Sequence, residues 1–170
     1  ELFGFVLHPA DGVAEPGLRA VLGVLTGDDA LARAWRTMPC TRSGHHAYLG
    51  GLVEHTVGVA SGVQALALWH PRLDADLLLA GALVHDIGHA RAFRLGATFE
   101  PTEEGRLRGH VAIGHEIVGE AARRAGLSGT RRAELLHVVD WHHGPPPGQN
   151  PAGARPEALA LWRANQLETA

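Results

Sequence analysis

Four predicted helices of this chain each carry a histidine on their apolar face, and this pattern limits how the helices can pack. The four residues are His55, His85, His110 and His142. Each lies three or four residues from apolar side chains, so it shares one side of its helix with them. A helix in a globular protein turns that side towards the core. The fold must therefore gather several imidazoles inside a bundle of helices.

Proline, glycine and capping residues divide the rest of the chain. The expected helices cover residues 17–25, 29–37, 48–69, 75–88, 109–125, 130–142 and 156–169. Asp28 and Asp74 are suited to cap two of them. Residues 90–108 are irregular, with a short hairpin expected near residues 92–105. Strand-like alternation is otherwise nearly absent, so we predict an all-α fold, a bundle of about six to seven helices.

The length and composition fit one soluble domain over residues 1–170. Of the 170 residues, 45% are hydrophobic and 19% are charged, as is ordinary for a globular chain. No apolar run approaches the roughly 20 residues that span a bilayer, so we expect no membrane association. The single cysteine, Cys40, excludes an internal disulfide and a zinc site built on several thiolates. It fits a reducing compartment, and we expect a cytoplasmic protein.

The charged and titratable residues have an unusual composition. All 15 basic residues are arginine, and there are 12 histidines. The formal net charge is −3, which excludes a strongly basic nucleic-acid surface at the level of the whole chain. Histidine is the commonest metal ligand in proteins. The composition therefore directs attention to a metal site.

A shared metal centre would satisfy the buried histidines together. One core histidine normally finds a hydrogen-bond partner, but several need several partners, and each unpaired polar group costs roughly 1–3 kcal/mol. Asp86 directly follows His85, and its carboxylate can bridge two ions while the histidine binds one. Histidine and carboxylate suit Mn, Fe, Co, Ni or Zn better than Mg. We therefore predict two divalent transition-metal ions, which can activate water for a phosphoryl displacement.

Four segments at the third to sixth expected helices carry a resemblance to a known family. They read, in order, GHHAYLGGLVEHT, ALVHDIGH, EEGRLRGHVAIGHEIV and DWHHG. This series resembles the HD-domain phosphohydrolase superfamily, and within it the YhaM-type 3′→5′ exoribonucleases, from about Ala34 to the C-terminus. The resemblance implies a bundle of five to seven helices with a dinuclear metal centre. In YhaM-type proteins an OB-like domain usually precedes the HD domain, and these 170 residues do not contain one.

The resemblance also assigns the metal ligands, with Asp86 as the bridge between the two ions. In such proteins the last ligand is an aspartate of the final helix, but here asparagine stands at that position. Its carbonyl oxygen is neutral, so we expect one metal site to be weakened. The ligands expected from the resemblance are His55, His85, Asp86, His110, His142, His143 and Asn165.

Asp86 and His89 are the candidate catalytic residues. Relatives often read HD-x-x-K, with the lysine near the scissile phosphate, whereas this chain reads HDIGH. A histidine can donate a proton near neutral pH, so His89 could take the role of that lysine. The alternative is a loop histidine at a helix C-terminus, where the helix dipole favours it.

Three further residues are candidates for substrate binding. Arg106 and Arg108 lie just before His110 and could hold phosphate oxygens in bidentate fashion, or they could be solvated loop charges. His46 belongs to the first quoted segment and either contacts substrate at the mouth of the pocket or anchors the long helix.

The resemblance implies a metal-dependent phosphodiesterase that acts on a nucleic-acid 3′ end, although the residues themselves indicate only phosphoester hydrolysis by a His/Asp centre. One alternative is a nucleotide phosphohydrolase that cleaves mononucleotides or cyclic nucleotides. A third hypothesis is a weakly active metal-binding module of a larger nucleic-acid-processing protein. It is motivated by Asn165 and by the absence of lysine.

Overall fold

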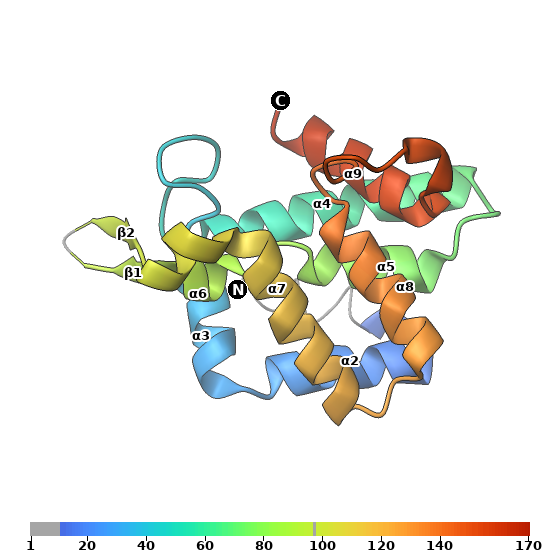
Figure 1. Ribbon diagram of the computed structural model, residues 1–170, viewed down its shortest axis with the longest axis horizontal. Helices are drawn as coiled ribbons and strands as arrows, with labels where there is room; N and C mark the ends of the chain where they lie inside the picture. The colour runs from blue at the N-terminus through green and yellow to red at the C-terminus, as the bar shows by residue number, and fades with distance from the viewer. Residues whose placement is uncertain (1–10, 97) are drawn as a thin grey trace.

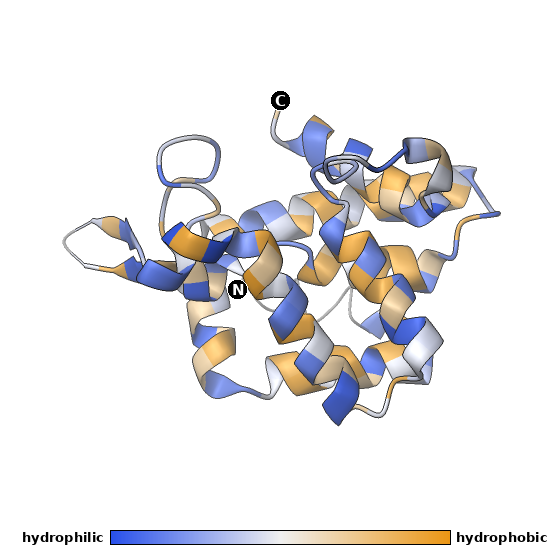
Figure 2. Cartoon of the chain, in the orientation of Figure 1, coloured by the Kyte–Doolittle hydropathy of each residue, from blue (hydrophilic) through white to orange (hydrophobic). Residues whose placement is uncertain are grey.

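Helix α5 (Ala75–Val84) lies in the middle of the computed structural model (Figure 1). The structure describes residues 11–96 and 98–170. Its residues 77–84 read LLLAGALV and are all buried. Figure 2 colours most of this helix as hydrophobic. A helix that is apolar all round must be covered on every side. Helices α2, α4, α8 and α9 pack against it, and their apolar faces complete one core.

Seven helices of nine residues or more occur in the described residues, together with one short helix and one hairpin. The long helices are α2 (Pro16–Thr26), α3 (Asp29–Thr37), α4 (Gly51–Trp69), α5, α7 (Glu103–Arg124), α8 (Gly129–Asp140) and α9 (Pro156–Glu168). The short elements are α6 (His89–Ala92), the 3₁₀ turn η1 (Pro151–Gly153) and the antiparallel strands β1 (Phe93–Leu95) and β2 (Phe99–Pro101). The predicted all-α bundle and its hairpin are thus confirmed.

The predicted helix caps are present. The Asp28 carboxylate accepts hydrogen bonds from the backbone N–H groups of Ala30 and Leu31 at the start of α3. Asp74 accepts one from the backbone N–H of Leu77 in α5, at 3.0 Å. Each carboxylate satisfies a donor that the first turn of a helix leaves free, which explains why these helices begin where the sequence predicted.

Three predicted boundaries were wrong. Helix α4 begins at Gly51 rather than at residue 48, because Gly50 takes a left-handed conformation with a φ of 83°. Helix α5 ends at Val84 rather than near residue 88, and turns follow it. Helix α7 begins at Glu103 rather than at residue 109, because the Thr102 hydroxyl accepts the backbone N–H of Gly105 and caps it.

Helix α7 has a kink at the residue where the sequence predicted its start. Gly109 has a φ of 73° and a ψ of 161°, which lie outside the helical region. His110 follows the kink and is the first residue of the longer segment. The kink therefore separates a short exposed first part from the part that packs on the core and carries the candidate ligand.

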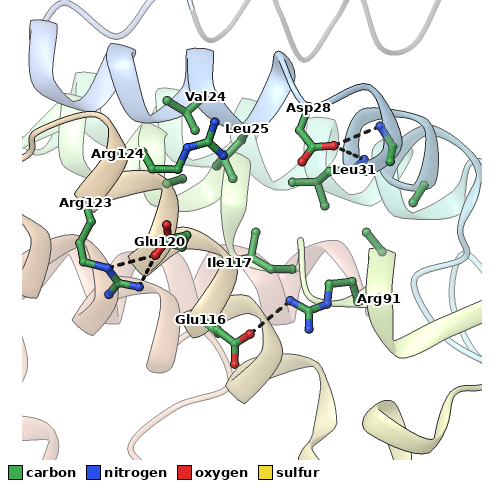
Figure 3. A pocket seen from close by; sticks show the side chains of 14 residues that line it. Val24, Leu25, Asp28, Leu31, Arg91, Glu116, Ile117, Glu120, Arg123 and Arg124 are labelled. Carbon is green, nitrogen blue, oxygen red and sulfur yellow. Dashed lines mark hydrogen bonds and ion pairs between the residues drawn. The ribbon is translucent and has the colours of Figure 1, made fainter.

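A cavity of about 710 Å³ lies between α2, α3, α6 and α7 (Figure 3). Leu25, Leu31 and Ile117 are among the apolar side chains that line it, and an ion pair between Glu120 and Arg123 lies at its rim. None of the predicted site residues lines this cavity. In the part of the chain that the structure describes, no helix combines the length and the apolar character that crossing a membrane requires.

Candidate metal centre

The predicted ligands come from five different parts of the bundle. One lies in the second turn of α4, two where α5 ends, one after the kink of α7, two in the turn after α8, and one in α9. In that order they are His55, His85, Asp86, His110, His142, His143 and Asn165. They gather at a second pocket of about 440 Å³, whose lining includes His55, Asp86, His110, His143 and Asn165.

The first group of ligand atoms surrounds one carboxylate oxygen of Asp86. The Nε2 atoms of His55 and His85 lie 3.1 Å apart. They lie 3.3 and 3.5 Å, respectively, from Asp86 Oδ2. All three side chains are almost completely buried. These atoms are close enough together to bind one metal ion.

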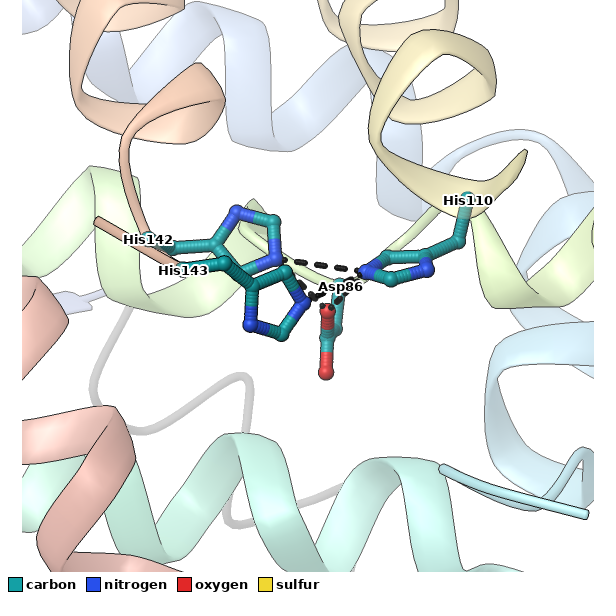
Figure 4. Close-up of side chains that lie close together, drawn as sticks. All are labelled: Asp86, His110, His142 and His143. Carbon is teal, nitrogen blue, oxygen red and sulfur yellow. Dashed lines mark hydrogen bonds and ion pairs between the residues drawn. The ribbon is translucent and has the colours of Figure 1, made fainter. Parts of the chain in front are cut away.

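The second group surrounds the other oxygen of the same carboxylate (Figure 4). Asp86 Oδ1 lies 3.4 Å from His110 Nε2 and 3.2 Å from His142 Nε2. His110 Nε2 lies 2.9 Å from His143 Nε2. Asp86 therefore belongs to both of these groups of possible metal ligands, with one oxygen turned to each.

In three of these histidines a hydrogen bond occupies Nδ1, on the opposite side of the ring from Nε2. The lone pairs on the Nε2 atoms therefore point towards one another. His85 donates its Nδ1–H to the carbonyl of Ala82 at 2.8 Å, and His142 donates its Nδ1–H to that of Val139. The Nδ1 of His55 is held in the same way by the Glu168 carboxylate. A neutral imidazole that donates from Nδ1 has only a lone pair at Nε2. Two lone pairs about 3 Å apart repel each other unless a cation lies between them, so these residues fit a metal ion.

Burial keeps most of these histidines neutral. Loss of hydration lowers the pKa of His85 to about 3, that of His110 to about 2 and that of His143 to about 4. A neutral imidazole is the form that binds a metal ion. For His55, burial lowers the pKa, but the Asp86 and Glu168 carboxylates beside the ring favour its protonated form, and they outweigh burial and raise the pKa.

The Asp86 carboxylate stays ionised despite its burial. Burial alone raises the pKa of Asp86, but the imidazole rings packed around it favour the ionised carboxylate and hold its pKa well below its ordinary value. Its Oδ1 atom has no hydrogen-bond partner among the described residues. A buried charged oxygen is costly to leave unpaired, and a cation would satisfy it.

His89 lies beside the ligands and lines the same pocket. Its ring stacks on that of His110 with centroids 4.0 Å apart, and its Nε2 lies 3.8 Å from Asp86 Oδ1. Burial lowers the pKa of His89, so the ring is neutral at pH 7 and offers one N–H. It is the first residue of α6, so the C-terminal dipole of a helix does not explain its position. Its catalytic role stays a prediction.

Asn165 lines the pocket and has a buried amide oxygen. Its Nδ2 donates to the backbone carbonyl of His142 at 3.0 Å. That hydrogen bond leaves Oδ1 buried, with no partner in residues 11–96 and 98–170. This oxygen is therefore free to accept a cation, and the role of Asn165 as a ligand stays a prediction.

The three predicted substrate-binding residues lie outside the lining of this pocket. Arg108 pairs with Glu104 and Glu116, each at 2.7 Å. Arg106 is exposed, and neither arginine lines the pocket. His46 bonds to Glu168 and to the Tyr48 hydroxyl.

The sequence did not point to several residues that the structure places at the site. Arg42 of the loop before α4 lines the pocket, and the Cys40 thiol lies 3.4 Å from Asp86 Oδ2. Burial raises the pKa of Cys40, so the thiol stays protonated and can donate to that oxygen. Glu168 follows Asn165 by three residues on α9, a helical spacing that could have indicated it.

The part of this chain that is similar to known proteins contains the candidate metal centre. The HD domain family model matches residues 52–169, which include every candidate ligand named above. Three curated relatives are named 3′-5′ exoribonuclease YhaM. They are those of Halalkalibacterium halodurans (34% identical over 110 residues, 65% of this chain and 34% of the relative), Geobacillus sp. strain WCH70 (35% over 106 residues, 62% and 33%) and Bacillus subtilis (32% over 106 residues, 62% and 34%).

The chain spans about a third of the length of the curated relatives it matches. No solved structure matches it significantly. The family model covers more than half of the chain, from the start of α4 to the end of α9. The chain therefore belongs to the HD domain family.

Proposed function

We propose that this chain is a metal-dependent phosphohydrolase that cleaves a phosphodiester at the 3′ end of a nucleic acid. The observation that carries the proposal is the position of Asp86, whose two oxygens each face a separate group of histidines. One carboxylate between two histidine groups is the ligand set of a dinuclear hydrolase. The names of the curated relatives support a nucleic-acid end as substrate.

Bound divalent ions would supply an acidified water and neutralise the charge that develops on the phosphate. His55, His85, His110, His142 and His143, with Asp86 between them, would hold the ions. Since histidine predominates in both groups, Mn, Fe, Co, Ni or Zn suits them better than Mg. His89 would direct its N–H at a phosphate oxygen or at the leaving oxygen, where it can hold or pass a proton.

The lining of the pocket favours a single nucleotide unit over a long duplex. Its volume is about 440 Å³, and Phe93 and Trp162 line it together with Arg42. An aromatic face can stack on a nucleobase, and a guanidinium can pair with a phosphate. We therefore assign phosphate binding to Arg42 in place of Arg106 and Arg108, which lie outside this lining.

A nucleotide phosphohydrolase is the second candidate function, and the net charge of −3 favours it. A protein that holds a long nucleic acid normally presents basic residues along its path. A weakly active metal-binding module is the third, because Asn165 offers a neutral oxygen where a carboxylate was expected. The described residues share one apolar core, which supports a single HD-type domain in each case.

The test is hydrolysis by the Mn-loaded chain of a single-stranded RNA labelled at its 5′ end, beside mononucleotide and cyclic-nucleotide substrates. We expect stepwise shortening from the 3′ end, and we expect Asp86→Asn to abolish it. Asp29→Asn is the matched control, because Asp29 is exposed in the first turn of α3, far along the chain from the ligands. Cleavage of mononucleotides alone would favour the second function. Metal binding without any turnover would favour the third.

A further inference from the structure

We propose that Glu168 is a positioning residue of the metal centre, which fixes the His55 ring for metal binding and joins it to the loop before α4. This inference rests on the proposed metal centre. Glu168 is the last residue of α9. It lies 113 positions along the chain from His55 and 122 from His46, yet its carboxylate contacts both.

The two oxygens of this carboxylate have different partners. Oε2 contacts the Nδ1 of His55, and Oε1 lies 2.7 Å from the Nε2 of His46. An ionised carboxylate can only accept, so each histidine donates an N–H to it. The other ring nitrogen of His46, Nδ1, lies 2.9 Å from the Tyr48 hydroxyl. Glu168 thus links His55 to His46, and His46 in turn contacts Tyr48.

His55 differs from His85 and His142 in the charge of its partner. His85 and His142 donate their Nδ1–H to backbone carbonyls, which are neutral. A carboxylate partner fixes the ring and makes the opposite nitrogen a stronger ligand. The effect is greatest where water is excluded, and His55 is only 1% exposed. Glu168 should therefore strengthen metal binding at the His55 group in particular.

The packing of α4 against α9 leaves space for this contact. A Cβ atom added to Gly58 would lie 2.9 Å from the Cγ and the Oε1 of Glu168. Any larger residue at position 58 would push the carboxylate aside. The glycine one turn after His55 thus admits the Glu168 side chain to the His55 ring.

A third metal ion among His46, His55 and Glu168 is the competing explanation, because these atoms are also close enough to bind one. It would require His55 to bind ions through both ring nitrogens. The separation of 2.7 Å between His46 and Glu168 is that of a charge-assisted hydrogen bond. We therefore assign the three residues to hydrogen bonding.

The experiment titrates the metal-free full chain with Mn²⁺ and with Zn²⁺ by calorimetry. The variants are Glu168→Gln, which keeps the shape and removes the charge, and Glu168→Ala, which removes the acceptor. Glu120→Gln is the control, because Glu120 is an exposed glutamate that pairs with Arg123 and does not line the pocket of the candidate ligands. Nitrogen-detected NMR of the imidazole rings reports which nitrogen of His55 carries the proton. Thermal unfolding of the metal-free variants measures any loss of stability.

We expect two ions for the wild type and for Glu120→Gln. In Glu168→Gln one ion should bind 10–100-fold more weakly, and the Nδ1–H form of His55 should lose its predominance. Wild-type affinity for both ions in Glu168→Gln, with or without a lower melting temperature, would overturn the positioning role alone. Three ions in the wild type and two in Glu168→Gln would show that Glu168 belongs to a third metal site and does not act as a positioning residue. A wild type that binds no ion would overturn both this inference and the proposed function.

Discussion

Replacing Gly88 by alanine should separate the two halves of the metal centre. Gly88 has ordinary helical angles, a φ of −60° and a ψ of −25°, so alanine suits its backbone. The obstacle is contact, because an added Cβ would lie 1.9 Å from the carbonyl oxygen of His110 and 2.7 Å from the nitrogen of Gly114. Ordinary contact begins at 3.4 Å, so α7 must move away by about 1.5 Å.

A shift of that size exceeds what metal coordination tolerates. Ligand distances in a working site lie within about 0.2 Å of their preferred values. Moving His110 away from Asp86 should abolish binding of one ion, whereas His55 and His85, which precede Gly88, keep theirs. Overpacking against backbone should also cost about 3 kcal/mol. That cost corresponds to a fall in melting temperature of about 6–12 °C for a chain of this size.

The assay combines elemental analysis of the bound metal with thermal unfolding. The control variant changes Gly114, the residue on the other side of the same contact. A Cβ on Gly114 would meet the Gly88 nitrogen at 3.5 Å, an ordinary distance. Gly114→Ala should therefore keep both ions and melt no lower than the wild type, since alanine also favours the helix. Two ions and an unchanged melting temperature in Gly88→Ala would refute the claim that this contact sets the geometry of the centre.

Three further predictions concern metal, charge and pH. Removing the metal with a chelator should lower the melting temperature by about 5–11 °C for each ion. The reference is protein in a free metal concentration of about 100 times the Kd. No shift on chelation would show that the histidines fold without metal. Asn165→Asp should lower the melting temperature of the metal-free chain, since a carboxylate oxygen then faces the carbonyl of His142, and should tighten metal binding in calorimetry. An unchanged affinity would show that position 165 is not a ligand. Burial raises the pKa of Asp74, but hydrogen bonds, chiefly from Arg131, outweigh it and lower the pKa below the ordinary 3.8. Its charge therefore stabilises the fold above pH 3.8, and this contribution is lost as the pH falls through the lower folded-state value. Asp74→Asn should reduce the free energy of unfolding at pH 7 by less than about 1 kcal/mol. In unfolding titrations at decreasing pH the difference from wild type should disappear. A difference that persists at pH 2 would contradict this.

The helices could be predicted because their signals are local. Asp28 and Asp74 act on groups two or three residues away, and the sequence displays both partners. The start of α7 was missed for a related reason. The apolar pattern resumes only after Gly109, and the six residues before it form an exposed turn of helix capped by Thr102. No apolar spacing marks such a segment, although the cap itself is visible in the sequence.

The candidate ligands could be listed from the sequence because they lie on apolar helix faces and in short recurring segments. Their partners could not, since partnership depends on how distant segments pack. Glu168 lies 113 residues from His55 and meets it only because α9 lies along α4. Arg108 lies close in sequence to His110 but pairs with Glu104 and Glu116 instead. Arg42, on a loop without periodic pattern, lines the pocket.

The single carboxylate between the two histidine groups has a consequence for how the centre fills. Among the ligands named above only Asp86 is charged, so the ligand set carries one negative charge for two divalent cations. The first cation reverses the sign of the site, and the second must enter a pocket that is already positive. Filling should therefore be anticooperative, and at low metal supply half-filled molecules should predominate. A phosphate in the pocket restores negative charge, so by reciprocal linkage substrate and second cation each favour the other.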